Sequence, residues 1–310
     1  MAEESDTTAP GSGGAFDGWL RRAVSERQCL SPRPAAQLAG ALGLDHEPDQ
    51  GDPLPLPWHW IYFTPRPHAA ATGEDGHPAR GDFLPPISLP RRMWAGSRLY
   101  VQETLRLGEA VTKRSWVERV SEKTGRAGPL VFVTVVHEYL RGEGRLALRE
   151  EQDIVYRGAD SAVLRGRGRG RDDAGREPPQ RPAAGRESPP SAAGDFPWQA
   201  ARSPDPVLLF RYSALTFNAH RIHYDRAYAR DREGYPDLVV QGPLIVTLLL
   251  DLAYRNDPRF APQTVTFKAR APAFVGEELL LRGRQAQRHT RLEAVAPGGS
   301  LATEVEVTQR

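Results

Sequence analysis

The densest group of chemically active side chains lies between Ser213 and Asp225, where the chain reads Ser-Ala-Leu-Thr-Phe-Asn-Ala-His-Arg-Ile-His-Tyr-Asp. His220 and His223 are three positions apart, a spacing that suits proton transfer near neutral pH or metal binding. A metal site needs three or four ligands, and Asp225 is the only nearby addition, so we expect no metal here. From residue types alone, the remaining alternative is that both histidines satisfy backbone groups in a polar loop.

The segments around this group predict one buried helix wrapped by strands. Gly242-Pro243 precedes an apolar run from Leu244 to Ala253, and proline in a first turn costs the helix no hydrogen bond. Because this run is apolar on every side, we expect a buried helix. A short helix should begin near Asp225, a suitable N-cap. Five strands are expected at residues 207–212, 264–269, 278–284, 291–295 and 301–308.

The first half predicts a second sheet. Alternating and β-branched residues indicate strands at 99–107, 115–121, 130–140 and 150–156, which we interpret as an antiparallel meander ending near Arg157. Before it, residues 15–41 show helical periodicity, with Val24 on one apolar stripe, and residues 47–90 are rich in Pro and Gly and predict an ordered but irregular loop.

Residues 158–195 contain almost no large apolar side chains and predict a disordered linker. The Arg/Gly alternation at 165–171 resembles an RNA-binding tail, but nearby acids offset its charge and no aromatics interleave, so we interpret it as a solvated linker. The expected organisation is an N-terminal helical extension at 1–47, a first domain at 48–157, a linker at 158–200 and a second domain at 201–310.

Composition limits the classes of partner and compartment. The formal net charge is +2, from 41 basic and 39 acidic residues, which argues against nucleic acid or an anionic membrane as the main partner. Cys29 is the only cysteine, which excludes an intrachain disulfide framework and thiolate metal sites. No apolar run approaches the ~18 residues of a membrane span, and no leader pattern opens the chain. We therefore expect a soluble, cytoplasmic protein.

The residues from Phe210 to Leu244 resemble a known motif. The string Phe-Arg-Tyr-Ser-Ala-Leu-Thr-Phe-Asn-Ala-His-Arg-Ile-His-Tyr-Asp, followed by Gly-Tyr-Pro-Asp-Leu-Val-Val-Gln-Gly-Pro-Leu, resembles the MaoC-like hotdog-fold dehydratases and hydratases. It is most similar to the branch of type 2 3-hydroxyacyl-thioester dehydratases and mesaconyl- or itaconyl-CoA hydratases. Residues 83–96, Phe-Leu-Pro-Pro-Ile-Ser-Leu-Pro-Arg-Arg-Met-Trp-Ala-Gly, resemble that branch's non-catalytic first hotdog. The resemblance implies an α+β double hotdog whose second domain is catalytic.

The same resemblance implies roles for three residues. The group's motif has a catalytic Asp five positions before a catalytic His, and here those positions hold Asn218 and His223. An amide cannot take a proton as a carboxylate does, so Asn218 is expected to orient the water and His223 to transfer the proton. Hydration of an enoyl thioester passes through an enolate, and the N–H of Gly242 at a helix start is the expected oxyanion donor. The alternative is that Gly242-Pro243 only opens the helix.

Three further residues are candidates for substrate binding. Arg221 suits a CoA phosphate or a substrate carboxylate, although it can equally pair with Asp225 or Asp231. His220 and Tyr224 lie beside it, and packing alone is the alternative for Tyr224. Arg91, Arg92 and Trp94 in the first half are weaker candidates for covering the acyl tunnel or contacting CoA.

The resulting hypothesis is a hydro-lyase that reversibly hydrates a 2-enoyl-CoA thioester without a cofactor. A short branched dicarboxylic acyl group, mesaconyl or itaconyl, is the leading substrate by resemblance. The alternatives are a 3-hydroxyacyl-thioester dehydratase of fatty-acid metabolism, a thioesterase on the same fold, and a non-catalytic acyl-CoA-binding hotdog. A double hotdog resembles a fused dimer, so the chain either acts alone or forms a homodimer.

Overall fold

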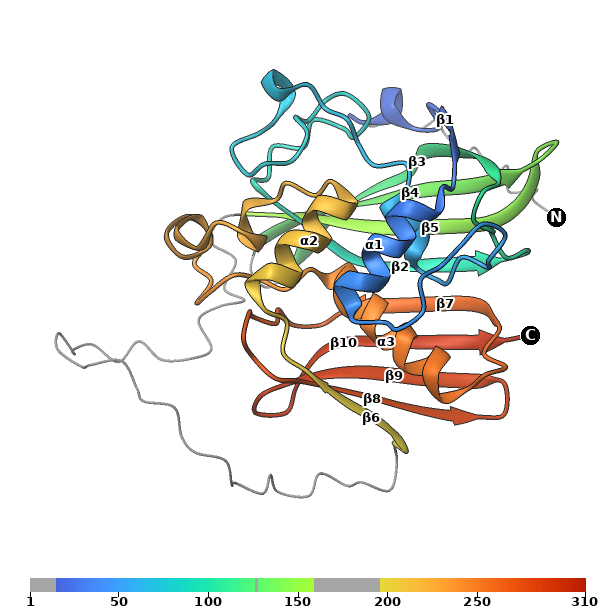
Figure 1. The fold of residues 1–310 in the computed structure, drawn as a ribbon. Helices are drawn as coiled ribbons and strands as arrows, with labels where there is room; N and C mark the ends of the chain where they lie inside the picture. The colour runs from blue at the N-terminus through green and yellow to red at the C-terminus, as the bar shows by residue number, and fades with distance from the viewer. Residues whose placement is uncertain (1–14, 126–127, 159–195) are drawn as a thin grey trace, which may run out of the picture.

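The computed structural model describes residues 15–125, 128–158 and 196–310; the linker predicted at 158–200 falls mostly on residues outside this part of the chain. Three helices lie on one side of a single curved sheet (Figure 1). They are α1 (Pro32–Leu42), α2 (Pro206–Thr216) and α3 (Gly242–Asn256). Short helical turns are η1 (Asp17–Trp19), η2 (Trp58–Ile61), η3 (Ala69–Ala71), η4 (Arg221–His223) and the π-helical η5 (Tyr228–Arg232).

The described strands form one ten-stranded sheet in the order β1-β3-β4-β5-β2-β7-β10-β9-β8-β6. All its pairings are antiparallel. The first half contains β1 (Val24–Cys29), β2 (Arg91–Val101), β3 (Ala110–Gly125), β4 (Gly128–Arg141) and β5 (Arg145–Arg157). The second contains β6 (Trp198–Arg202), β7 (Pro262–Ala269), β8 (Leu279–Ala286), β9 (His289–Ala296) and β10 (Ser300–Gln309).

The two halves repeat one arrangement. A short edge strand, β1 or β6, is followed by a helix, α1 or α2, and then by four strands with the same spatial order. The innermost strand of each repeat lies at the centre of the sheet, where β2 pairs with β7. This is the α+β double hotdog expected from the sequence. Residues 43–90 of the first half form irregular loops with η2 and η3, as predicted, where the second half has α3.

Four details differ from the sequence-based expectations. The strand predicted at 99–107 lies earlier in the chain, because β2 spans Arg91–Val101. The four strands of the first half are not a simple meander, because β2 pairs with β5 on the side away from β3. Val24, predicted on a helical stripe, opens β1, which pairs with β3. The strand predicted at 207–212 is wrong, since these residues belong to α2, whose start is fixed by the Asp205 side chain accepting the Leu208 N–H at 2.7 Å.

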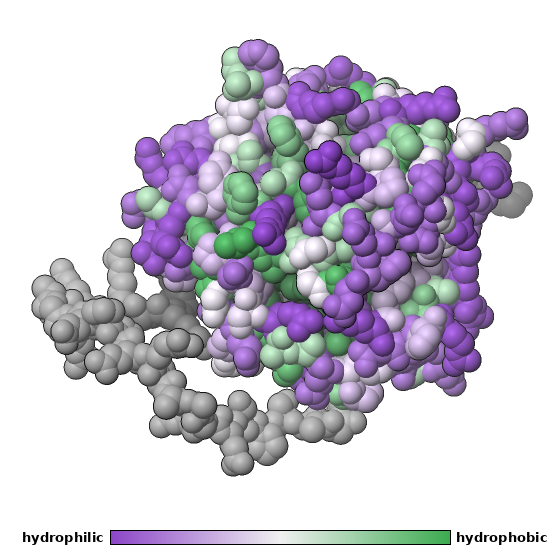
Figure 2. All heavy atoms as spheres, viewed as in Figure 1, coloured by the Kyte–Doolittle hydropathy of each residue, from purple (hydrophilic) through white to green (hydrophobic). Residues whose placement is uncertain are grey.

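Helix α3 is buried as its composition predicts. Nine of its residues from Leu244 to Ala253 are buried, and it packs against β6, β8, β9 and β10. Helices α1 and α2 pack against each other, so the interior of the second repeat continues into that of the first. Figure 2 shows the surface over these helices, where hydrophobic side chains gather between hydrophilic ones.

The junction of the two repeats depends on a glycine. Gly96 of β2 lies opposite Lys268 of β7, next to a register shift at Trp94. A Cβ at position 96 would be 2.3 Å from the carbonyl oxygen of Phe267, a backbone atom held in the sheet. Any side chain here forces β2 and β7 apart.

We therefore expect Gly96→Val to lower the free energy of unfolding by about 1–3 kcal/mol, the usual cost of overpacking a core. Urea denaturation of the full chain measures this change. Gly40→Ala is the matched control, because a Cβ at that position in α1 meets nothing within 4 Å and alanine favours a helix. Equal stability of the Gly96→Val variant and the natural chain would contradict the tight junction.

Candidate active site

The motif of residues 213–225 runs from the last turn of α2 through η4, in the connection to α3. Helix α2 ends at Phe217, which adopts a left-handed conformation with φ of 49° and turns the chain. The Asn218 N–H then donates to the Ser213 carbonyl at 2.8 Å. The loop continues into η4, and Asp225 caps the following turn by accepting the Tyr228 N–H at 3.0 Å, as predicted. The motif is thereby fixed at both ends.

His223 is buried and held in one orientation. Its Nδ1 lies 2.7 Å from the carbonyl oxygen of Val239, which can only accept, so Nδ1 carries the hydrogen and Nε2 is left as an acceptor. Burial lowers the pKa of His223 to about 4, against the raising effect of the Val239 hydrogen bond. The imidazole is therefore neutral at physiological pH, with its Nε2 lone pair available.

Asn218 presents donors to the site rather than an acceptor. Its Oδ1 accepts the backbone N–H of His220 at 3.1 Å, which fixes the orientation of the amide. The Nδ2 hydrogens have no partner among the described residues. This geometry suits an amide that donates to the oxygen of a water or a substrate, and it excludes Asn218 as a base.

Gly242 is the first residue of α3, and its neighbourhood is open. A Cβ added there would meet no atom within 4 Å. The preceding Gln241 is buried and ties the helix start to α2, because its Nε2 donates to the Leu209 carbonyl and to Ser213 Oγ, each at 2.9 Å. The start of α3 therefore sits at a fixed place beside the motif.

Arg221 and Tyr224 are engaged with protein groups. The Arg221 guanidinium bonds to Asp225 at 2.7 and 3.1 Å and stacks over the Tyr228 ring at 4.2 Å. Of the alternatives left open by the sequence, the structure has the pairing with Asp225. The Tyr224 hydroxyl donates to the Ala219 carbonyl at 3.1 Å, and its side chain is half exposed. These two residues lie on the outer side of the loop.

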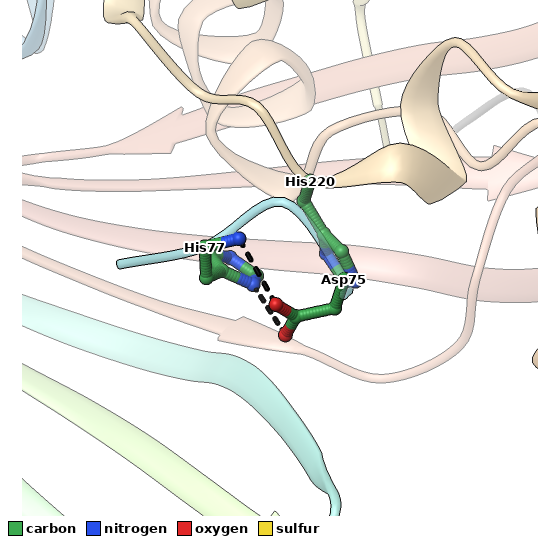
Figure 3. A group of neighbouring side chains, drawn as sticks. All are labelled: Asp75, His77 and His220. Carbon is green, nitrogen blue, oxygen red and sulfur yellow. Dashed lines mark hydrogen bonds and ion pairs between the residues drawn. The ribbon is translucent and has the colours of Figure 1, made fainter. Parts of the chain in front are cut away.

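Two residues of the first half, which the sequence did not single out, join the motif. Asp75 and His77 lie in the loop between η3 and β2, and Figure 3 shows them beside His220. The His77 ring contacts the His220 ring with centroids 4.2 Å apart, and His220 contacts His223 at 5.5 Å. No spacing signal could have found this pair, since 143 positions separate His77 from His220.

The carboxylate of Asp75 is bonded to His77 through both oxygens. His77 Nδ1 lies 2.9 Å from Oδ2, and the His77 backbone N–H donates to Oδ1 at 3.0 Å. Burial raises the pKa of Asp75, but the hydrogen bonds from His77 outweigh it and lower that pKa well below its usual range. Burial also lowers the pKa values of His77 and His220. Near neutral pH the site therefore contains the ionised Asp75 carboxylate and the three neutral imidazoles of His77, His220 and His223.

Asp75, His77 and His220 are also residue types that ligate metals, and their potential ligand atoms lie within 4.8 Å of one another. The structure therefore supplies the additional ligands that sequence spacing alone did not. However, His77 already satisfies both carboxylate oxygens, so the geometry has an explanation that requires no ion.

The part of the chain that contains the motif matches a known protein family. The family of hydroxyacyl-thioester dehydratases type 2 matches residues 57–275, which include both the Asp75–His77 loop and the motif at 213–225. This chain belongs to that family. It is 42% identical over 294 residues to the mesaconyl-C(4)-CoA hydratase of Chloroflexus aurantiacus, covering 93% of this chain and 96% of the relative. A mitochondrial hydroxyacyl-thioester dehydratase type 2 of Schizosaccharomyces pombe is 44% identical over 79 residues, 25% of this chain and 26% of the relative.

Solved structures share the fold at low sequence identity. A MaoC-like dehydratase superposes with a TM-score of 0.64 at 14% identity, covering 95% of this chain and 99% of the other. HtdX of Mycobacterium tuberculosis gives 0.61 at 15%, covering 93% and 100%. A double hotdog protein of the same organism gives 0.51 at 17%, covering 95% and 97%. None of the described helices is long and apolar enough to cross a membrane.

The lowered pKa of His223 predicts how stability depends on pH. The folded protein resists protonation of His223 until about pH 4, whereas the unfolded chain protonates it near 6.5. The unfolded state therefore binds more protons between these values, and the free energy of unfolding falls as the pH is lowered from 6.5 to 4. In urea titrations across this range, His223→Gln should show a smaller fall than the natural chain. An identical slope would contradict the buried neutral imidazole; His68→Gln, an exposed position, is the control.

Proposed function

We propose that this chain is a hydro-lyase that adds water reversibly across the double bond of a 2-enoyl-CoA thioester. The observation that carries this proposal is the buried His223, with Nδ1 fixed on Val239 and Nε2 left as an acceptor, in a family of thioester dehydratases. Hydration needs a base for the water, a donor for the enolate oxygen and a means of returning the proton to Cα. Family membership and the motif geometry together favour this reaction over simple acyl-CoA binding.

In this proposal, the water lies between His223 and Asn218. His223 accepts a hydrogen of the water at Nε2 and acts in proton transfer, while the Asn218 amide donates to the water oxygen. As the oxygen bonds to Cβ, the alkene electron pair moves to the thioester oxygen, where the Gly242 N–H at the start of α3 stabilises the enolate. The enolate then takes a proton at Cα.

A short branched dicarboxylic acyl group is the proposed substrate, with mesaconyl-CoA first. The support is the 42% identity over nearly the full length to a mesaconyl-C(4)-CoA hydratase. Dehydration of a 3-hydroxyacyl thioester of fatty-acid metabolism is the second candidate, because the matching family has that description. His220, Arg221 and Tyr224 remain proposed neighbours of the substrate, although Arg221 must leave Asp225 to bind an anion.

The proposal extends to organisation and surroundings. We propose that the second hotdog, which includes the motif, is catalytic and that the first begins at β1, because β1 and α1 occupy the places that β6 and α2 occupy in the second. The remaining parts of the proposal are that the protein is cytoplasmic, needs no cofactor, acts as a single chain or a homodimer, and has a linker before β6.

Purified protein should consume the enoyl absorbance of mesaconyl-CoA without releasing thiol. Crotonyl-CoA, which lacks the second carboxylate, should be consumed with a kcat/KM at least ~10-fold lower if that carboxylate is recognised by charged groups. Parallel thiol measurement is the control for hydrolysis. Thiol release would indicate a thioesterase, and absence of any conversion with both esters would contradict the proposed function.

The pH profile of kcat/KM tests the role of His223. Since protonation of His223 in the free enzyme removes the Nε2 lone pair that accepts a hydrogen of the water, kcat/KM should be independent of this group near neutral pH and fall about tenfold per pH unit below about pH 4. His223→Ala should lower kcat by at least ~10²-fold at neutral pH, the usual contribution of acid–base catalysis. Turnover that survives this substitution would contradict the mechanism.

A further inference from the structure

The loop of residues 73–77 is held against the motif by hydrogen bonds to its main-chain carbonyls. The Arg221 N–H donates to the Asp75 carbonyl at 2.9 Å, and Arg221 Nη1 donates to the Glu74 carbonyl at 3.2 Å. At Gly76, with φ of +89°, an added Cβ would lie 1.8 Å from the Ala219 carbonyl oxygen. The first repeat therefore delivers Asp75 and His77 to one place beside the motif.

One ring nitrogen of His77 is hydrogen-bonded to Asp75, and the other is available to a ligand. Asp75 is an ionised acceptor, so its bond to His77 Nδ1 puts the hydrogen on Nδ1. Nε2 is then an acceptor, and no described residue bonds to it. The Arg92 charge adds to burial in keeping the resting imidazole neutral, which a base requires.

His77 is connected to His223 through the ring of His220. Its ring touches the His220 ring, which in turn touches that of His223. A positive charge on His77 lowers the pKa of His223, so the two imidazoles interact electrostatically. Protonation of one therefore disfavours protonation of the other, which limits the pair to one transferred proton.

We propose that His77, oriented by Asp75, is a second acid–base residue of the site and forms with His223 the two-residue dyad that Asn218 cannot complete. This inference rests on the proposed hydratase function and names the residue of the first repeat that takes part in it. This chain has an amide at position 218, where the hydratase motif has a carboxylate. Asp75 supplies a carboxylate instead, and it acts through the imidazole of His77.

In hydration, the water donates one hydrogen to Nε2 of each imidazole. Its oxygen bonds to Cβ, one O–H bond breaks with the proton passing to His77 Nε2, and the alkene electron pair moves to the thioester oxygen. When the enolate collapses to the thioester, His77 returns its proton to Cα. The sum is one water added, and both imidazoles end neutral.

Once His77 is included, it takes the proton in place of His223, which alone has that role in the motif, because the His77 cation is the better stabilised of the two. An imidazolium at His77 forms an ion pair with the Asp75 carboxylate at 2.9 Å, whereas one at His223 faces the neutral Val239 carbonyl. Charge-assisted hydrogen bonds are about twice as strong as neutral ones. His223 then holds the water and leaves residual catalysis when His77 is absent.

The test is steady-state kinetics of the full chain on the enoyl-CoA that the natural enzyme converts fastest. His77→Gln should lower kcat by ~10²-fold or more with little change in KM and Tm. Asp75→Asn should lower kcat similarly, because an amide facing Nδ1 moves the hydrogen to Nε2 and removes the acceptor; an analogous tautomer reversal costs ~10⁴-fold in a serine protease. His68→Gln, on the same segment but exposed, should behave as the natural enzyme.

Additional measurements separate a catalytic from a structural role. If the two imidazoles act as one unit, His77→Gln combined with His223→Gln should be little worse than the poorer single variant. A kcat for His77→Gln within about threefold of the natural value would overturn the proposal, as would losses that appear only in KM or Tm. Loss of activity with EDTA and its return with Zn²⁺ would also overturn it, by assigning the cluster to a metal. If the natural enzyme hydrates no enoyl thioester, the proposed function itself fails.

Discussion

The backbone pairing of β2 with β7 sets the relative position of everything else in this molecule. Five residue pairs join the two repeats into one sheet, and Gly96 allows the close approach that this pairing needs. The loop containing Asp75 and His77 precedes β2 in the first repeat and contacts the motif of the second repeat at Ala219 and Arg221. A site assembled from residues so far apart in sequence requires a rigid junction of this kind.

Burial determines the electrostatics of the site. Three histidines lie together and are kept neutral by desolvation, so each offers a lone pair at physiological pH. The Asp75 carboxylate beside them stays ionised through its bonds to His77. Asp225, the motif's own acid, is turned outward to Arg221 and to the cap of the next turn. The acid that faces the imidazoles thus comes from the other repeat.

The sequence was most informative where periodicity and local chemistry agree. The all-apolar run after Gly242-Pro243 indicated α3, and seven of the described strands, β3 to β5 and β7 to β10, lie close to the predicted ranges because their alternation is clear. Residues 207–212 failed as a strand because a short apolar run fits either period; Asp205-Pro206, an N-cap followed by an N1 proline, was the signal for α2. The order of the strands in the sheet could not be predicted, because it depends on long-range pairing that local sequence patterns do not encode.

For the site, the sequence located the motif but not its surroundings. His223 and Asn218 lie on the loop that follows α2, and Gly242 begins α3, as the local motif predicts. The Asp75–His77 pair belongs to a Gly- and Pro-rich loop with no period, and its approach depends on the β2–β7 pairing. Likewise, the local sequence does not determine whether Arg221 binds an anion or pairs with Asp225, because this depends on side-chain geometry.

In the proposed site, the first repeat supplies Asp75 and His77, and the contact of Gly76 with Ala219 holds them in place. The most direct measurement is kcat of Gly76→Ala, which alters no reactive atom but places a Cβ 1.8 Å from the Ala219 carbonyl oxygen. Gly81→Ala is the matched comparison, with a similar φ of +94° in the same loop but no neighbour of its Cβ nearer than 3.6 Å. We predict a kcat at least ~10-fold lower for Gly76→Ala than for Gly81→Ala, as expected for reacting groups displaced by about an ångström. Equal values for the two variants would contradict a site shared between the repeats.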